Sequence, residues 1–167
     1  SHSRAGVKDV RSNMNMMLSG NKGEWSEIYV FLRLLDKGRL DIADENLQAV
    51  PGEFYRVLEI MRKETENTNH YVRKKDMVSI HVKNDQTGEV EVFSYPIAVF
   101  AAKANLLLEL IQKAKGRAFT LPEASAFLQS IRVGSIKDAG HNRDITIKIE
   151  DFHTGTPQTL GFSIKSY

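Results

Sequence analysis

The sequence predicts an α/β fold, in which a mixed β-sheet ending in a β-meander is flanked by helices. Two periodicities predict it: apolar residues recur every three to four positions in several segments before residue 131, and polar and apolar residues alternate in most segments after it. The composition agrees, because 167 residues with 41% hydrophobic side chains suffice for the core of one globular domain.

The N-terminal segments predict two helices. Apolar residues at helical spacing mark residues 6–18, and the turn-forming stretch 19–23 interrupts them. A stronger helix follows over residues 24–37 and ends at Gly38. Its apolar stripe consists of Trp25, Ile28, Phe31, Leu32 and Leu35. We expect Trp25 to pack in the core. Glu24 lies in the first turn, where a carboxylate complements the helix dipole, and Glu27 lies beside the stripe.

The middle of the chain predicts a less regular succession of elements. We expect, in order, a loop over residues 41–50, a short helix over 53–63 and a polar link over 64–69. Residues 77–82 and 90–93 both alternate, and they flank the turn-forming stretch 84–88. This arrangement predicts a β-hairpin.

Two helices and three strands are expected after the hairpin. The first helix spans residues 97–115 and is closed by Gly116; the second is capped by Thr120 and has Pro122 at an early position. The apolar face of the second helix consists of Ala124, Phe127, Leu128 and Ile131. The strands of the β-meander are predicted over residues 133–137, 144–151 and 159–166, with a turn at 153–157.

The composition excludes several kinds of site and setting. The chain contains no cysteine, so disulfides, thiolate nucleophiles and cysteine-ligated zinc are excluded, and a reducing, cytoplasmic location fits. No apolar run approaches the roughly 20 residues that a membrane helix needs, so we expect no membrane association. The net charge of +2 is too small to indicate nucleic-acid binding by itself.

Asp144 and Lys165 carry the chemistry that the sequence suggests. Asp144 opens one predicted strand and Lys165 lies in the next, on the same face as Ser163 because residues two apart in a strand share a face. Hydrolysis of a phosphodiester needs a divalent cation held by carboxylates, and a nearby lysine stabilises developing charge or holds the attacking water. An aspartate and a lysine on neighbouring strands suit that reaction.

These residues resemble the PD-(D/E)xK nuclease motif, in which an aspartate and a second acid two positions before a lysine bind Mg²⁺. Here Ser163 holds the second acidic position. The resemblance implies two ways to supply the missing carboxylate. One is a glutamate from an earlier helix in a Gly-x-x-x-Glu setting, which Gly23 and Glu27 match, with Glu24 ranked below Glu27 as a ligand. The other, found in some enzymes that cut CCGG sites, is a glutamate from a helix after the Ser-x-Lys strand, which here would lie beyond Tyr167.

A longer resemblance links the chain to the HpaII family of type II restriction endonucleases. It is carried by residues 20–27, 144–147, 154–155 and 160–166, and the middle of the chain matches only loosely. It implies a Mg²⁺-dependent deoxyribonuclease that recognises CCGG and acts as a homodimer on double-stranded DNA, with a cognate DNA methyltransferase acting on the same site. The implied catalytic residues are Asp144, Lys165, Glu27 and Ser163, with Asp144 and Glu27 as metal ligands.

The resemblance also sets an expected domain organisation. Residues 1–167 form one nuclease domain or its N-terminal part. The expected divisions are a helical start with the core helix at 1–38, a helical and β-hairpin insertion at 39–130, and the catalytic β-meander at 131–167. Members of the family have considerably longer chains, so we expect the C-terminus to be truncated.

Candidate DNA contacts come from basic and amide side chains, of which Asn142 and Arg143 lie in the loop just before Asp144. They are Arg73, Lys74, Lys75, Lys137, Asn142 and Arg143. Two alternatives remain open: a catalytically inactive DNA-binding module of the same fold, for which the serine at position 163 gives a reason, and a non-specific or repair nuclease. A serine hydrolase is not indicated, because Ser163 lacks the glycine-framed turn of a nucleophile elbow.

Overall fold

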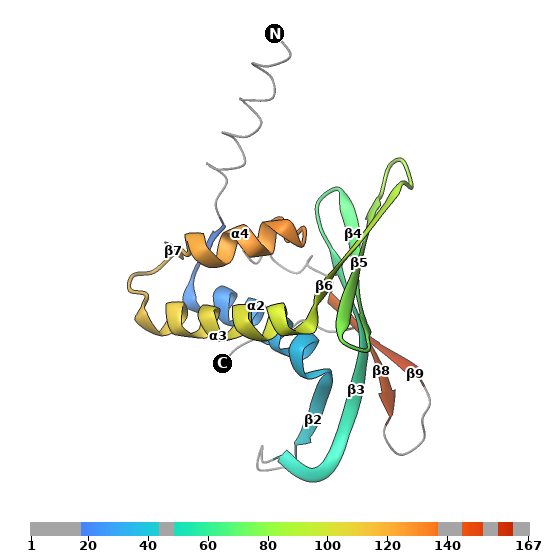
Figure 1. The fold of residues 1–167 in the computed structure, drawn as a ribbon. Coiled ribbons are helices and arrows are strands. Elements are labelled where there is room, and N and C mark those ends of the chain that lie inside the picture. Colours follow the sequence, from blue (N-terminus) through green and yellow to red (C-terminus); the bar gives the residue numbers. More distant parts are fainter. Residues whose placement is uncertain (1–17, 44–48, 137–144, 152–156, 162–167) are drawn as a thin grey trace.

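A computed structural model describes residues 18–43, 49–136, 145–151 and 157–161. Its helices gather on one side of a twisted β-sheet (Figure 1). Strands of the sheet lie in the order β6-β5-β4-β3-β8-β9, with β2 also paired to β3, and the described pairings are antiparallel. The expected combination of a sheet with flanking helices is confirmed.

The elements have the following bounds. They are β1 Ser19–Gly20, α2 Lys22–Lys37, β2 Arg39–Ala43, β3 Ala49–Lys63, β4 Asn67–Lys74, β5 Met77–Asn84, β6 Val90–Pro96, α3 Ile97–Lys113, β7 Phe119–Thr120, α4 Pro122–Ser130, β8 Ile145–Asp151 and β9 Pro157–Gly161. None of these helices is long and apolar enough to span a membrane. The helix predicted over residues 6–18 lies almost entirely outside the described residues.

Helix α2 confirms the predicted core helix and begins two residues earlier than expected. Asn21 caps it: its Oδ1 accepts from the Glu24 N–H at 2.8 Å, and Glu24 Oε1 accepts from the Asn21 N–H at 2.9 Å. This reciprocal capping box satisfies two amide groups that the first turn of a helix leaves unpaired. Gly38 ends the helix in the left-handed region, with φ 68°.

Gly38 is also packed directly beneath the Arg73 side chain, so we expect replacement by alanine to destabilise the protein. A Cβ at this position would collide with the Arg73 guanidinium, and the left-handed backbone alone costs a residue with a Cβ about 1–2 kcal/mol. Urea unfolding measures the loss. Gly88→Ala is the matched control, because Gly88 has φ 74° but open space around a Cβ. Equal losses in both variants would contradict the packing of Arg73 on Gly38.

Strand β3 replaces the predicted short helix over residues 53–63, and that prediction is wrong. The pairing of β3 with β8 shifts register between Val57 and Glu59, so a β-bulge at Leu58 puts one extra residue into β3. Consequently the two fully buried residues Val57 and Ile60 are three positions apart. That spacing imitates a helix in the sequence.

The neighbouring predictions need smaller corrections. The loop predicted over residues 41–50 is wrong where it is described, because β2 and the start of β3 occupy both its ends. Strand β4 was not expected; it begins inside the predicted polar link, of which only residues 64–66 lie outside a strand. The hairpin of β5 and β6 is confirmed, with Ile80 opposite Phe93.

The later helices are confirmed with different ends. Ala114, in extended conformation, caps α3 instead of Gly116. Leu121 occupies the N-cap of α4 without a side-chain hydrogen bond, so Thr120 is not the cap, whereas Pro122 does hold the first helical position. Residues 133–136 form no strand, which corrects the first strand of the predicted β-meander.

Candidate active-site region

Most of the predicted catalytic residues lie outside the described part of the chain. Asp144, Ser163 and Lys165 belong to this group, and so do the candidate DNA contacts Asn142 and Arg143. Their roles therefore stay predictions. The structure does describe the strands that lead to them and the helix that carries Glu27.

Strands β8 and β9 form the last two strands of the predicted β-meander. They pair antiparallel, with Ile147 opposite Leu160 and Thr146 opposite Gly161. Asp144 stands directly before β8 and Ser163 two positions after β9. In the sequence, both residues therefore adjoin the same end of the hairpin of β8 and β9, as the predicted site requires.

Helix α2, which carries Glu27, lies against β3 beside the start of β8. Trp25, fully buried, anchors this turn of the helix: its indole N–H donates to the Phe119 carbonyl at 3.1 Å. One turn after Glu27, Phe31 packs edge-on against Tyr71 and beneath the guanidinium of Arg62. Arg62 is the strand partner of Ile145, the first residue of β8. Phe31 therefore contacts Arg62, which pairs with Ile145, and Ile145 directly follows Asp144 in the sequence.

Glu24 has a structural contact at the start of α2, the helix that also carries Glu27. The Glu24 carboxylate completes the capping box of α2, which is the helix-terminal role expected of it. Glu27 is partly exposed on the following turn. Both side chains are partly buried, and the role of either glutamate as a metal ligand stays a prediction.

A complete metal site is not visible in the described residues, where His, Asp and Glu side chains do not gather in threes. Asp144, the principal predicted ligand, lies outside them. The carboxylate of Glu27 is a suitable hard oxygen ligand for Mg²⁺. Magnesium binding thus stays a prediction that rests on Asp144 and Glu27.

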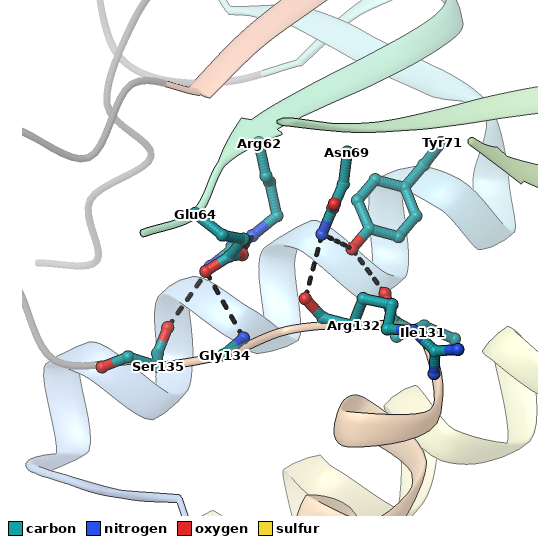
Figure 2. Close-up of polar contacts among 8 residues, drawn as sticks. All are labelled: Arg62, Glu64, Asn69, Tyr71, Ile131, Arg132, Gly134 and Ser135. Atoms are coloured by element: carbon teal, nitrogen blue, oxygen red, sulfur yellow. Dashed lines mark hydrogen bonds and ion pairs between the residues drawn. The ribbon is translucent and has the colours of Figure 1, made fainter. Parts of the chain in front are cut away.

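Buried polar side chains of β3 and β4 hold the stretch that follows α4, here called the 131–135 segment (Figure 2). Tyr71 donates from its hydroxyl to the Ile131 carbonyl at 2.7 Å, and Asn69 donates from Nδ2 to the Arg132 carbonyl at 2.9 Å. Both side chains are fully buried. Burial raises the pKa of the Tyr71 hydroxyl, so it remains a proton donor.

An ion pair continues this row toward β8. Arg62 Nε lies 3.2 Å from Glu64 Oε2, and its Nη2 lies 3.5 Å from the Ser135 carbonyl oxygen. Glu64 Oε1 in turn accepts a long hydrogen bond of 3.4 Å from the Gly134 N–H. The sequence does not indicate this pair, because the apolar spacing over residues 53–63 predicts a helix instead of the strand that carries Arg62.

The basic cluster at residues 73–75 divides into two kinds of side chain. Arg73 is half-buried and donates to the last carbonyls of α2, from Nε to Leu35 at 2.7 Å and from Nη2 to Asp36 at 3.3 Å. It therefore supports the negative end of the helix dipole. Lys74 and Lys75 are exposed at the turn between β4 and β5. Of the three candidate DNA contacts, these two keep accessible charges.

Known proteins match most of the chain. The model of the HpaII restriction endonuclease family matches residues 21–167. The type II restriction enzyme HpaII of Haemophilus parainfluenzae is 37% identical over 155 residues, which cover 92% of this chain. The match covers 42% of the relative, so this chain spans less than half of that protein's length. No solved structure matches the chain.

Proposed function

The chain belongs to the HpaII restriction endonuclease family, and from this premise we propose that it acts as part of a Mg²⁺-dependent endonuclease that cuts DNA at CCGG sites. The observation that carries the proposal is the 37% identity to a type II restriction enzyme across 92% of the chain. A contact among the described residues supports it: Phe31, one turn after Glu27, lies against Arg62, which is the strand partner of Ile145 at the start of β8.

In the proposed site, Asp144 and Glu27 hold the metal ion and Lys165 positions the attacking water. If the pairing of β8 and β9 continues in the same register beyond Thr146 and Gly161, Ser163 would stand opposite Asp144. Lys165 would follow two positions further, on the face that Ser163 shares. When bound, Mg²⁺ supplies charge neutralisation at the phosphate and activates the water.

Digestion of a plasmid that contains CCGG sites tests this function with the full-length natural protein. We expect discrete fragments with Mg²⁺ and no cleavage with a chelator. A plasmid whose CCGG sites have been removed is the control and should stay intact. A smear would indicate the non-specific or repair nuclease. Binding to CCGG duplexes without cleavage would indicate the inactive module, which the serine at position 163 favours.

The source of the second metal ligand is testable at Glu27. We expect Glu27→Gln to lower the cleavage rate at least about tenfold and to raise the Mg²⁺ concentration needed for half-maximal rate, because an amide binds the cation more weakly than a carboxylate. Glu24→Gln is the matched control, since glutamine can still complete a capping box. Unchanged cleavage by both Glu27→Gln and Glu24→Gln would move the ligand to a glutamate beyond Tyr167, and loss only in Glu24→Gln would move it to Glu24.

Lys74 and Lys75 are the proposed phosphate contacts among the described residues. We expect their joint replacement by alanine to weaken DNA binding and to reduce the slope of log affinity against log salt by about 0.9 per lost phosphate contact. Lys113→Ala with Lys115→Ala is the control. The turn that follows Lys74 contacts the start of α3, whereas Lys113 and Lys115 lie at the end of that helix and beyond it, away from the turn. An unchanged slope would remove both lysines from the DNA interface.

The partners follow from the same proposal. A palindromic site such as CCGG suits a homodimer, because two-fold protein symmetry then matches two-fold DNA symmetry. A cytoplasmic methyltransferase that modifies the same sequence would protect the host DNA. Size measurement of the full-length protein, with and without a CCGG duplex, tests the dimer.

A further inference from the structure

The ion pair of Arg62 and Glu64 is the most buried pair of opposite charges among the described residues. Relative exposures of the two side chains are 2% and 9%, whereas the other described pairs are more open to solvent. Removing two charges from water is costly, and apolar residues of similar size often serve stability equally well. The position of the pair therefore needs an explanation other than stability.

The pair touches the chain on both sides of residues 137–144. On the preceding side, it contacts the Gly134 N–H and the Ser135 carbonyl. On the following side, Arg62 is the strand partner of Ile145. The guanidinium also lies over the Phe31 ring at 5.1 Å, in the helix that carries Glu27.

Hydrogen bonds and buried side chains also fix the rest of the 131–135 segment. Asn69 binds the carbonyl of Arg132, whose φ of 69° is unusual for a residue with a side chain. Val133 and Ile136 are buried on either side of the contacts to Gly134 and Ser135. The backbone is thus held in place up to residue 136.

We propose that Arg62 and Glu64 are positioning residues that align the start of β8, and with it Asp144, against helix α2. This inference rests on the proposed function, in which Asp144 and Glu27 must approach one metal ion. The ion pair acts through the backbone of the 131–135 segment and of β8. In this proposal the pair acts without contacting substrate or metal.

The test replaces the pair with apolar residues, as Arg62→Met with Glu64→Leu, in the full-length protein. Removing both charges avoids leaving one of them buried without a partner. Glu64→Gln is a milder second variant, which keeps the side-chain shape. Lys63→Met with Asp85→Asn is the matched control, because that ion pair of 2.8 Å starts from the adjacent residue of β3 but is exposed.

We expect the Arg62→Met, Glu64→Leu variant to stay folded and to bind CCGG duplexes, without Mg²⁺, within about twofold of the wild type. Its single-turnover cleavage should fall about 10–100-fold, with a higher Mg²⁺ requirement, as when support for metal ligands is lost. Glu64→Gln should show the same changes to a smaller extent, and the control pair should show none. Wild-type rates and Mg²⁺ dependence in the folded variants would overturn the proposal.

Amide hydrogen exchange without metal decides the question independently of cleavage. Residues 131–136 and 145–147 should exchange at least about tenfold faster in the Arg62→Met, Glu64→Leu variant, because their local opening becomes easier. The control pair should leave these amides unchanged. Unchanged exchange in the test variant overturns the inference even if the protein cuts DNA. If the wild type does not cut DNA, the proposed function fails, and the exchange result still shows whether the pair aligns these segments.

Discussion

Replacing Asp144 with alanine is expected to abolish DNA cleavage and to leave DNA binding largely intact. The proposed role of the carboxylate is to hold the cation that stabilises the charge developing on the phosphate. Such stabilisation is worth several kcal/mol, which corresponds to at least about a thousandfold in rate. Binding should survive, because phosphate and base contacts elsewhere supply most of the affinity.

Two measurements on full-length protein separate these effects. Single-turnover cleavage of a CCGG duplex with Mg²⁺ reports the reaction, and titration of the same duplex in the presence of a chelator reports binding. Asp151→Ala is the matched control at the opposite end of β8, and it should cleave normally. Cleavage at the wild-type rate by Asp144→Ala would remove this residue from the active site.

A loss of both cleavage and binding would have a different meaning. It would indicate that Asp144 supports the fold of the site, because removal of a metal ligand alone leaves phosphate contacts in place. Thermal unfolding of the variant distinguishes the two cases. A folded variant that binds DNA and does not cut it is the outcome that the proposed role requires.

Local periodicity allowed the elements with unbroken patterns to be predicted. The apolar stripe predicts helix α2, and all five of its residues are at most 2% exposed: Trp25, Ile28, Phe31, Leu32 and Leu35. Strand β8 alternates without interruption, and its buried residues are Ile145, Ile147 and Ile149. Such patterns depend only on neighbours in the sequence, and the residues that they predict to be buried are buried in the structure.

Strand β3 shows where this reasoning fails. Its bulge at Leu58 is produced by pairing with β8, about 90 residues further along the chain, and a local pattern cannot show it. The buried polar contacts share this difficulty, because Tyr71 and Ile131 are 60 residues apart in the sequence. Recognition of β3 as a central strand would have placed Arg62 on its buried face, where a charge draws attention.

The residues of the candidate site are predicted by motifs and family resemblance, not by periodicity. Asp144, Lys165 and Glu27 were proposed from motif spacing and family resemblance, and the family is shown by the match over residues 21–167. The capping contact of Glu24 needed the structure, since its carboxylate accepts from the Asn21 N–H. Arg73 needed it too, because its partners are carbonyl groups of a helix distant in sequence.

The largest loss of stability is expected at Trp25, which should cost about 3–5 kcal/mol when replaced with alanine. Its side chain is fully buried, stacks on Phe119 with ring centroids 6.5 Å apart, and donates its N–H to the Phe119 carbonyl. Truncation would leave a cavity between α2 and β7. Urea unfolding followed by circular dichroism measures the loss, because the variant lacks the single tryptophan of the chain.

Two further variants divide this loss into its causes. Trp25→Phe keeps most of the packing and removes the hydrogen bond, so we expect a loss of about 1–3 kcal/mol from the unpaired carbonyl. Tyr29→Ala, on the next turn of α2 and only partly buried, should cost less than Trp25→Ala. A loss below about 1 kcal/mol in Trp25→Ala would contradict the buried position of the indole.

Trp25→Phe also connects the stability of α2 with the proposed chemistry. The indole fixes the turn that carries Glu27, two residues away, while the Glu27 carboxylate itself is retained. A folded Trp25→Phe protein should therefore cleave more slowly than the wild type but bind CCGG duplexes equally well. Its Mg²⁺ requirement should rise in the same direction as that of Glu27→Gln, because both changes weaken the same ligand. A normal Mg²⁺ requirement in Trp25→Phe, alongside a raised one in Glu27→Gln, would mean that α2 holds Glu27 in place without the indole hydrogen bond.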